Sequence, residues 1–181
     1  TAACRQVDPA GRLGACGCNA TDTVMPRLAI DGQTAYYAYR RPVPAGQPPV
    51  VFVHGAGGTH QHWLYQVRDL SSPDRGDQPR PPTYAVDLPG HGRSAGAGRE
   101  SIQAYGDWLV AFLDAVEVQR AILVGHSMGG AIALDVALRQ PQRVAGLGLV
   151  ATGARLKVAP AILAGILTEH QAAVHLICDW A

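Results

Sequence analysis

The sequence predicts an α/β protein whose mostly parallel sheet is covered by helices on both faces. Four short runs are almost continuously apolar, without polar alternation: VVFV, TYAV, AILV and VAGLGLVA. Strands of this kind are buried on both faces, which is typical of a parallel sheet. Segments with apolar residues at helical spacing alternate with these runs, and this alternation indicates βαβ units.

Length and composition fit a single domain with a sizeable core, because 48% of the 181 residues are hydrophobic and only 16% are charged. The formal net charge of +1 supplies no attraction to nucleic acid or to an anionic membrane. Arg139, Gln140 and Pro141 interrupt the longest apolar region, so no segment is expected to cross a membrane. We therefore expect a soluble, cytoplasmic protein whose partner is a small molecule.

Residues 1–24 differ from the rest of the chain, because they contain three of the four cysteines and no periodic apolar pattern. The cysteine spacing lacks the paired arrangement of a zinc site, so we expect free thiols and no metal. We expect these residues to form a leader that is disordered or non-native. The core of the domain is then expected to occupy residues 25–154, starting at Met25.

The first elements of the expected core are a hairpin and two strands joined by a helix. RLAI and TAYYAY flank the turn pair Asp31 and Gly32, which favours a β-hairpin. VVFV is the next strand, and a helix is expected from about Gln61 to Leu70. TYAV is then a strand that ends in a loop punctuated by glycines.

The following elements alternate between helix and strand. Ser101 is the expected N-cap of a helix over residues 102–116, whose apolar residues recur at helical spacing. AILV follows as a strand, and the next helix starts after Ser127 and runs to Arg139, where Gln140 and Pro141 end it. VAGLGLVA is the last expected strand.

One serine lies between closely spaced glycines in VGHSMGG, after a strand-like run and before a helix-like run. This context predicts an abrupt strand-to-helix turn with a strained residue, Ser127, at its apex. Such a turn needs glycine two residues before and two after the apex, and these are Gly125 and Gly129. The N–H of Met128, at the start of the helix, favours developing negative charge. We expect Ser127 to be a nucleophile; the alternative is an idle hydroxyl in a glycine-rich turn.

A second glycine-rich stretch, HGAGG, follows the strand that ends at Val53. Acyl transfer needs a second N–H donor that points at the oxyanion from a neighbouring loop. Gly55 and Gly57 let this backbone approach closely, and the N–H of Ala56 is the expected donor. A phosphate-binding loop is the alternative, but the lysine and Ser/Thr of a P-loop are absent.

Three segments in this order, with their strands, resemble the α/β-hydrolase fold family: HGAGG with Trp63 downstream, DLPGHGRS at residues 87–94, and GHSMGG. The resemblance covers residues 25–155. Within the family, the segments resemble the esterase, C–C hydrolase and cofactor-free haloperoxidase-like branches.

The resemblance implies that Ser127 is the nucleophile and that the N–H groups of Ala56 and Met128 form the oxyanion hole. It also implies a helical cap inserted after the sixth strand, and residues 155–181 would begin it. Pro160 can open a helix there. We expect the fold to be truncated within this cap insertion.

A serine nucleophile needs a histidine base oriented by a carboxylate, and in this family the chain order is serine, acid, histidine. The sequence after Ser127 offers three acids and two histidines: Asp135, Glu169, Asp179, His170 and His175. A helical rise of about 1.5 Å per residue carries Asp135 away from the serine, and the other four lie in the expected cap. We therefore expect the triad acid and histidine to be absent from residues 1–181.

The histidines before the serine are expected to be structural or to line the substrate site. The resemblance gives His54, His91 and His126 positions without a base role, and it assigns His54 to the support of the glycine loop. His60 and His62 suggest a metal pair, but the sequence shows no acidic or cysteine partner for them.

Serine at position 127 favours attack on an acyl carbonyl, because relatives that cleave epoxides or carbon–halogen bonds use aspartate there. We expect a serine hydrolase that cleaves a carboxylic ester or related acyl compound through an acyl-enzyme, without metal or organic cofactor. One alternative is a C–C bond hydrolase or haloperoxidase-like enzyme with the same turn. Another is a non-catalytic protein of this fold that binds a small ligand.

Overall fold

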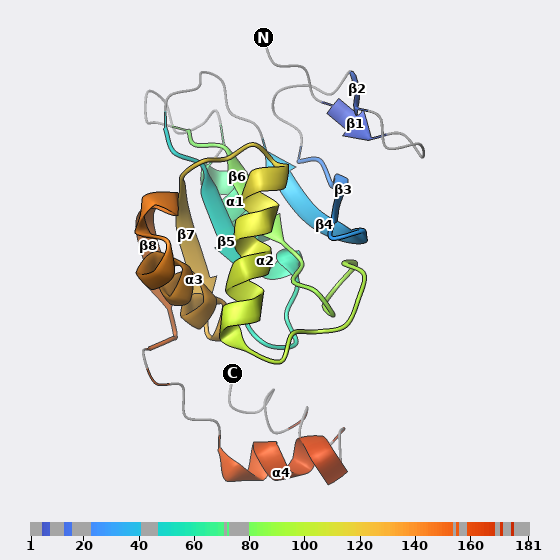
Figure 1. Cartoon of the computed structure of the whole chain (residues 1–181), viewed down its shortest axis with the longest axis vertical. Helices are drawn as coiled ribbons and strands as arrows, with labels where there is room; N and C mark the ends of the chain where they lie inside the picture. Colours follow the sequence, from blue (N-terminus) through green and yellow to red (C-terminus); the bar gives the residue numbers. More distant parts are fainter. Residues whose placement is uncertain are drawn as a thin grey trace.

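The computed structural model shows one large sheet with helices packed against it (Figure 1). The residues that the structure describes are 5–7, 13–15, 23–40, 47–70, 72, 80–153, 155, 159–168, 171 and 175. All structural statements below concern these residues.

Six strands form the sheet. In chain order they are β3 (Arg27–Ile30), β4 (Gln33–Arg40), β5 (Val50–Val53), β6 (Thr83–Val86), β7 (Ala121–His126) and β8 (Val144–Val150). Their order across the sheet is β3-β4-β6-β5-β7-β8. The four neighbouring strands β6, β5, β7 and β8 pair in parallel. At the other edge, β3 pairs antiparallel with β4, and β4 pairs antiparallel with β6. The predicted α/β class with a mostly parallel sheet is therefore confirmed.

Helices cover both faces of this sheet. They are α1 (Leu64–Leu70), α2 (Ile102–Ala115) and α3 (Met128–Arg139), with short 3-10 turns η1 (His60–Trp63) and η3 (Pro141–Arg143). The core residues of α2 and α3 belong to one apolar cluster, and those of η1 and α1 belong to a second. Figure 1 shows α2 in front of the central strands and α1 behind them.

Strand β5 illustrates why these strands lack polar alternation. Val51 and Val53 belong to the cluster under α2 and α3, whereas Val50 and Phe52 belong to the cluster under α1. The Phe52 ring stacks on Trp63 at a centroid distance of 4.9 Å. All four residues of β5 are buried because each face of the sheet has its own cover.

The turn residues of the opening hairpin adopt the backbone conformation that the sequence predicts. Asp31 and Gly32 have φ of 51° and 75°, and Ile30 pairs directly with Gln33. Positive φ at both central residues is typical of the two-residue turn that matches the twist of the flanking strands. This turn sets the register of the edge strands.

Two helix boundaries differ slightly from expectation. The helix expected from Gln61 begins as the 3-10 turn η1 at His60. Thr59 is the N-cap of this turn, and its hydroxyl accepts a hydrogen bond from the Gln61 amide at 3.2 Å. The Ser101 hydroxyl accepts from the Ala104 amide at 3.1 Å, as an N-cap should, and α2 ends one residue early at Ala115.

The predicted leader contains two short strands, β1 (Arg5–Val7) and β2 (Leu13–Ala15), which pair antiparallel in a sheet of their own. Val24 already pairs with the edge strand β4: its amide donates to the Tyr39 carbonyl at 2.9 Å, and the Tyr39 amide donates back at 2.8 Å. Contact with the large sheet thus starts one residue before the expected boundary at Met25. Most other residues of the leader lie outside the described ranges, and its disorder stays a prediction.

The expected helix after Pro160 is present as α4 (Pro160–Thr168). It lies apart from the large sheet in Figure 1. Its assignment to a cap stays a prediction, and most of the remaining residues of 155–181 lie outside the described ranges. No described helix combines the length and the apolar character that crossing a bilayer requires.

We predict that Phe112→Ala lowers the free energy of unfolding by about 3–5 kcal/mol. Phe112 is fully buried on α2 and packs edge-on against Tyr37 at a centroid distance of 5.2 Å. Leu138→Ala is the control, because Leu138 is 79% exposed and should change the unfolding free energy by no more than about 0.5 kcal/mol. Urea unfolding measures both; similar costs for the two variants would contradict the assigned core.

Candidate active site

The predicted strand-to-helix turn is present at Ser127, between the end of β7 and the start of α3. Ser127 has φ 51° and ψ −118°, a conformation that is rare for residues other than glycine. Its amide donates to the Val150 carbonyl at 3.0 Å, and its carbonyl accepts from the Thr152 hydroxyl at 2.8 Å and the Gly130 amide at 3.0 Å. These bonds to β8 and α3 hold the strained residue in place.

Glycine is required on both sides of Ser127 because backbones approach closely there. A Cβ on Gly125 would overlap the carbonyl group of Gly129. A Cβ on Gly129 would overlap the carbonyl oxygens of Val53 and His54 at the end of β5. The two glycines thus let α3 start directly above the central strands. Ser127 is half-buried, and its side chain makes no capping hydrogen bond.

The glycine turn after β5 lies against the serine. The Gly58 amide donates to the Gly55 carbonyl at 3.1 Å, and Gly57 has φ 70°. A Cβ on Gly55 would lie 3.2 Å from the Cβ of Ser127, which shows how closely this turn approaches the apex. Ala56 is exposed at the tip of the turn.

The two predicted oxyanion-hole amides belong to these two neighbouring segments. Met128 is the first residue of α3, where helix amides have no partner within the helix. Within the described part of the chain, neither the Met128 amide nor the Ala56 amide donates to another backbone group. Their role as oxyanion-hole donors stays a prediction.

His54 supports the glycine turn and has no free ring nitrogen. The side chain is fully buried; its Nδ1–H donates to the Gly55 carbonyl at 2.7 Å, and its Nε2 accepts from the Leu88 amide at 3.1 Å. Burial lowers the pKa of His54 from 6.5 to about 4, although the bond to Gly55 opposes this shift. His54 is therefore neutral at physiological pH and cannot take a proton from a neighbouring hydroxyl.

His60 has an acidic partner, which corrects the expectation that neither histidine of the HQH segment has one. Its Nδ1–H donates to Asp87 Oδ1 at 2.9 Å, and its backbone amide donates to the same oxygen at 2.6 Å. The other oxygen of Asp87, Oδ2, accepts from the Arg93 amide at 2.9 Å. Asp87 is fully buried and His60 nearly so. The described residues contain no group of three or more His, Cys, Asp or Glu side chains that could hold a metal.

This role of Asp87 is not among the predictions from the sequence, where the residue appears only as the first of DLPGHGRS. An available signal was an aspartate placed directly after a buried strand and before Gly90 and Gly92. A Cβ on Gly92, which has φ 56°, would overlap the Asp87 carboxylate. The glycine lets the loop wrap around this buried charge.

The candidate triad residues after Ser127 are not assembled at the serine within the described ranges. Asp135 forms an ion pair with Arg139, with 2.9 Å between Oδ2 and Nε, and Arg139 also contacts Asp107 on α2 at 2.7 Å. His175 is exposed. Glu169, His170 and Asp179 lie outside the described residues.

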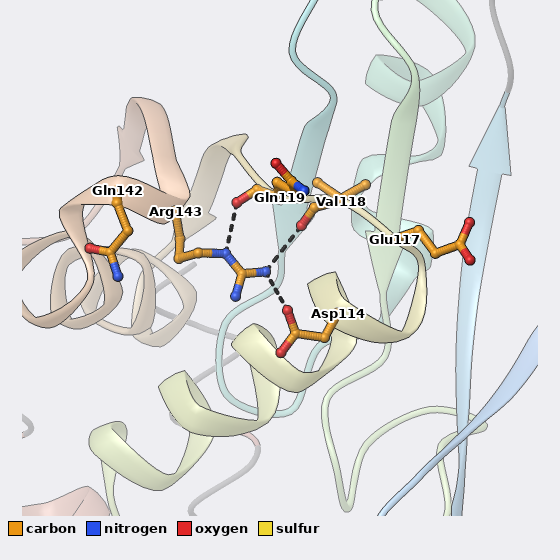
Figure 2. Close-up of a pocket in the computed structure, with 6 residues that line it drawn as sticks. All are labelled: Asp114, Glu117, Val118, Gln119, Gln142 and Arg143. Carbon is orange, nitrogen blue, oxygen red and sulfur yellow. Dashed lines mark hydrogen bonds and ion pairs between the residues drawn. The ribbon is translucent and has the colours of Figure 1, made fainter.

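An open pocket of about 570 Å³ is lined by residues just before β7, so it lies at the end of β7 opposite Ser127. Figure 2 shows the residues that line it. The Arg143 guanidinium at this pocket is already engaged: it pairs with Asp114 at 2.7 Å and donates to the carbonyls of Gln119 at 2.7 Å and Val118 at 3.0 Å. This pocket is separate from the serine turn and contributes nothing to it.

Comparison with known proteins identifies relatives for most of the chain. The family model described as alpha/beta hydrolase fold matches residues 48–176. The dihydrolipoyllysine-residue acetyltransferase component of the acetoin cleaving system of Pseudomonas putida is 43% identical over 108 residues, which make up 59% of this chain and 27% of that protein. The chain thus spans less than a third of the length of this relative.

Two solved enzyme structures are also similar to this chain. A thermophilic esterase superposes with a TM-score of 0.70 at 30% identity, over 88% of this chain and 57% of the esterase. An N-acyl homoserine lactone degrading enzyme superposes with a TM-score of 0.68 at 30% identity, over 82% of this chain and 54% of that enzyme.

We predict that Gly129→Ala destabilises the protein by about 3 kcal/mol or more, because the added methyl group overlaps backbone atoms that cannot move independently. Gly146→Ala in β8 is the matched control, since its Cβ would lie 3.6 Å from Ile122 in ordinary contact. Chemical denaturation of both variants tests this. Equal stability of the two variants would mean that the close approach at Gly129 does not exist.

We predict that acidification from pH 6.5 to pH 4 removes about 3 kcal/mol of stability through His54. Its folded-state pKa of about 4 lies below the unfolded value of 6.5, so the unfolded state binds more protons between these limits. The free energy of unfolding must therefore fall as the pH falls through this window. His54→Gln should flatten this dependence in urea titrations at several pH values; an unchanged slope would exclude His54 as its source.

Proposed function

Because this chain belongs to the α/β hydrolase fold family, we propose that it is a serine hydrolase that cleaves a carboxylic ester or a related acyl compound. Ser127 Oγ attacks the acyl carbonyl carbon, and the amides of Ala56 and Met128 donate to the oxygen that becomes negatively charged. The leaving group departs from the resulting acyl-enzyme, and water then releases the acid. The small-molecule acyl substrate is the proposed partner.

The observation that carries this proposal is the strained backbone of Ser127. A non-glycine residue in such a conformation costs about 1–3 kcal/mol, and strain of this kind clusters at functional sites. The strained residue is half-buried and lies at the carboxyl end of β7, against the turn that contains Ala56 and directly before Met128. In open α/β sheets, ligands bind at that end of the strands.

The hydroxyl proton must pass to a general base during the attack. We propose that neither this base, a histidine, nor the acid that orients it lies within residues 1–181. A cytoplasmic location and the absence of cofactor, metal, nucleic acid and membrane as partners are also part of the proposal.

Acyl transfer is a second candidate, because the Pseudomonas putida relative is by name an acetyltransferase component. An acyl-enzyme at Ser127 can be attacked by a thiol as well as by water, and only the acceptor differs. C–C bond cleavage, haloperoxidase-like activity and ligand binding without catalysis remain alternatives that the experiment below separates.

We predict that a fluorophosphonate probe labels Ser127 in the protein at its full natural length. Ser127→Ala should abolish labelling and lower kcat/KM on a short-chain p-nitrophenyl ester by roughly a thousandfold or more, because the nucleophile is lost. Ser101→Ala, which removes a helix-capping hydroxyl, is the control and should label normally. Mass spectrometry of the labelled peptide and initial rates are the measurements.

The outcomes separate the candidates. A folded protein that binds no probe would favour the non-catalytic ligand-binding alternative. Labelling with faster acyl release to an added thiol than to water would favour the transferase. Labelling without turnover of esters or thioesters would favour C–C bond cleavage or haloperoxidase-like activity.

A further inference from the structure

Two consecutive residues after β6 hold both ends of the glycine turn that contains Ala56. Before the turn, the Leu88 amide donates to His54 Nε2 at 3.1 Å. After the turn, the Asp87 carboxylate accepts from the His60 amide at 2.6 Å and from its Nδ1–H at 2.9 Å. The turn is thus attached at both ends to the two residues that directly follow β6, Asp87 and Leu88.

The attachment at Asp87 is stronger than an ordinary hydrogen bond. Asp87 is fully buried and His60 is 4% exposed, so water does not compete for either group. Three N–H donors converge on this carboxylate, two from His60 and one from Arg93. Hydrogen bonds to a charged acceptor are about twice as strong as neutral ones, and losing a donor would leave a buried charge undersatisfied.

The tip of the turn has little support of its own. Ala56 and Gly57 are exposed, and a Cβ on Gly57 would meet nothing within 4 Å. One internal hydrogen bond, from the Gly58 amide to the Gly55 carbonyl, closes the turn. The direction of the Ala56 amide therefore depends on where the two ends of the turn are fixed.

We propose that His60 and Asp87 are positioning residues for catalysis, which hold the Ala56 amide in line with the oxyanion at Ser127. This inference rests on the function proposed above. An oxyanion-hole donor stabilises the transition state more than the bound substrate. A displacement of the donor by about 1 Å is enough to weaken this stabilisation. The predicted signature is a loss in kcat with little change in KM.

The test compares His60→Leu, which removes the ring donor, with His60→Asn, whose side-chain nitrogen can replace Nδ1. In the protein at its full natural length, His60→Leu should lower kcat on the p-nitrophenyl ester about tenfold or more, with KM changed by less than about threefold. Affinity for a trifluoromethyl ketone, which forms a tetrahedral adduct with the serine, should fall in proportion to kcat/KM. His60→Asn should restore kcat to within about threefold of wild type.

Gln61→Ala is the matched control, because Gln61 is the exposed neighbour of His60 and should leave kcat unchanged. If His60→Leu does not fold, His60→Gln replaces it with the same expected loss, since its longer side chain places the amide beyond the Nδ1 position. Thermal melts establish that each variant compared is folded.

If the wild-type protein is labelled at Ser127 but the folded Leu or Gln variant keeps the wild-type kcat, the positioning role would be overturned. The proposed function would then remain intact. Equal losses in stability and activity without rescue by Asn would also overturn it, because they would indicate a purely structural role. Absence of label at Ser127 in the wild-type protein would overturn the proposed function and this inference together.

Discussion

The close approach of α3 to the end of β5 is the constraint on which the candidate site depends. Gly129 lies so near the carbonyl oxygens of Val53 and His54 that no side chain fits between them. This approach brings the start of α3 and the turn after β5 into one place, so the amides of Met128 and Ala56 come from neighbouring segments. The strained backbone at Ser127 is the local consequence, and the bonds from its main chain to β8 and Thr152 help to offset the cost.

The sequence predicts the parts of this arrangement that short-range chemistry determines. Asp31 and Gly32 specify a two-residue turn, and the glycines around Ser127 specify the strand-to-helix turn, because each depends on backbone conformations of a few consecutive residues. Burial on both faces of β5 could be predicted from its composition. The roles of Ser127, Ala56 and Met128 follow from the same patterns and stay predictions.

Contacts between distant segments could not be predicted in this way. Asp87 and His60 are separated by 27 positions, and only the pairing of β5 with β6 brings their loops together. The same pairing gives His54 a partner in the Leu88 amide. Histidines that look interchangeable in the sequence therefore differ in the fold: His54 is held neutral by burial, whereas His60 donates to a buried carboxylate.

The most direct test of the account is a crystal structure of the protein after reaction with a fluorophosphonate. The phosphonyl group should be bonded to Ser127 Oγ, with its oxygen about 2.7–3.1 Å from the amide nitrogens of both Ala56 and Met128. An adduct on another residue, or an oxygen that points away from these two amides, would contradict the proposed site.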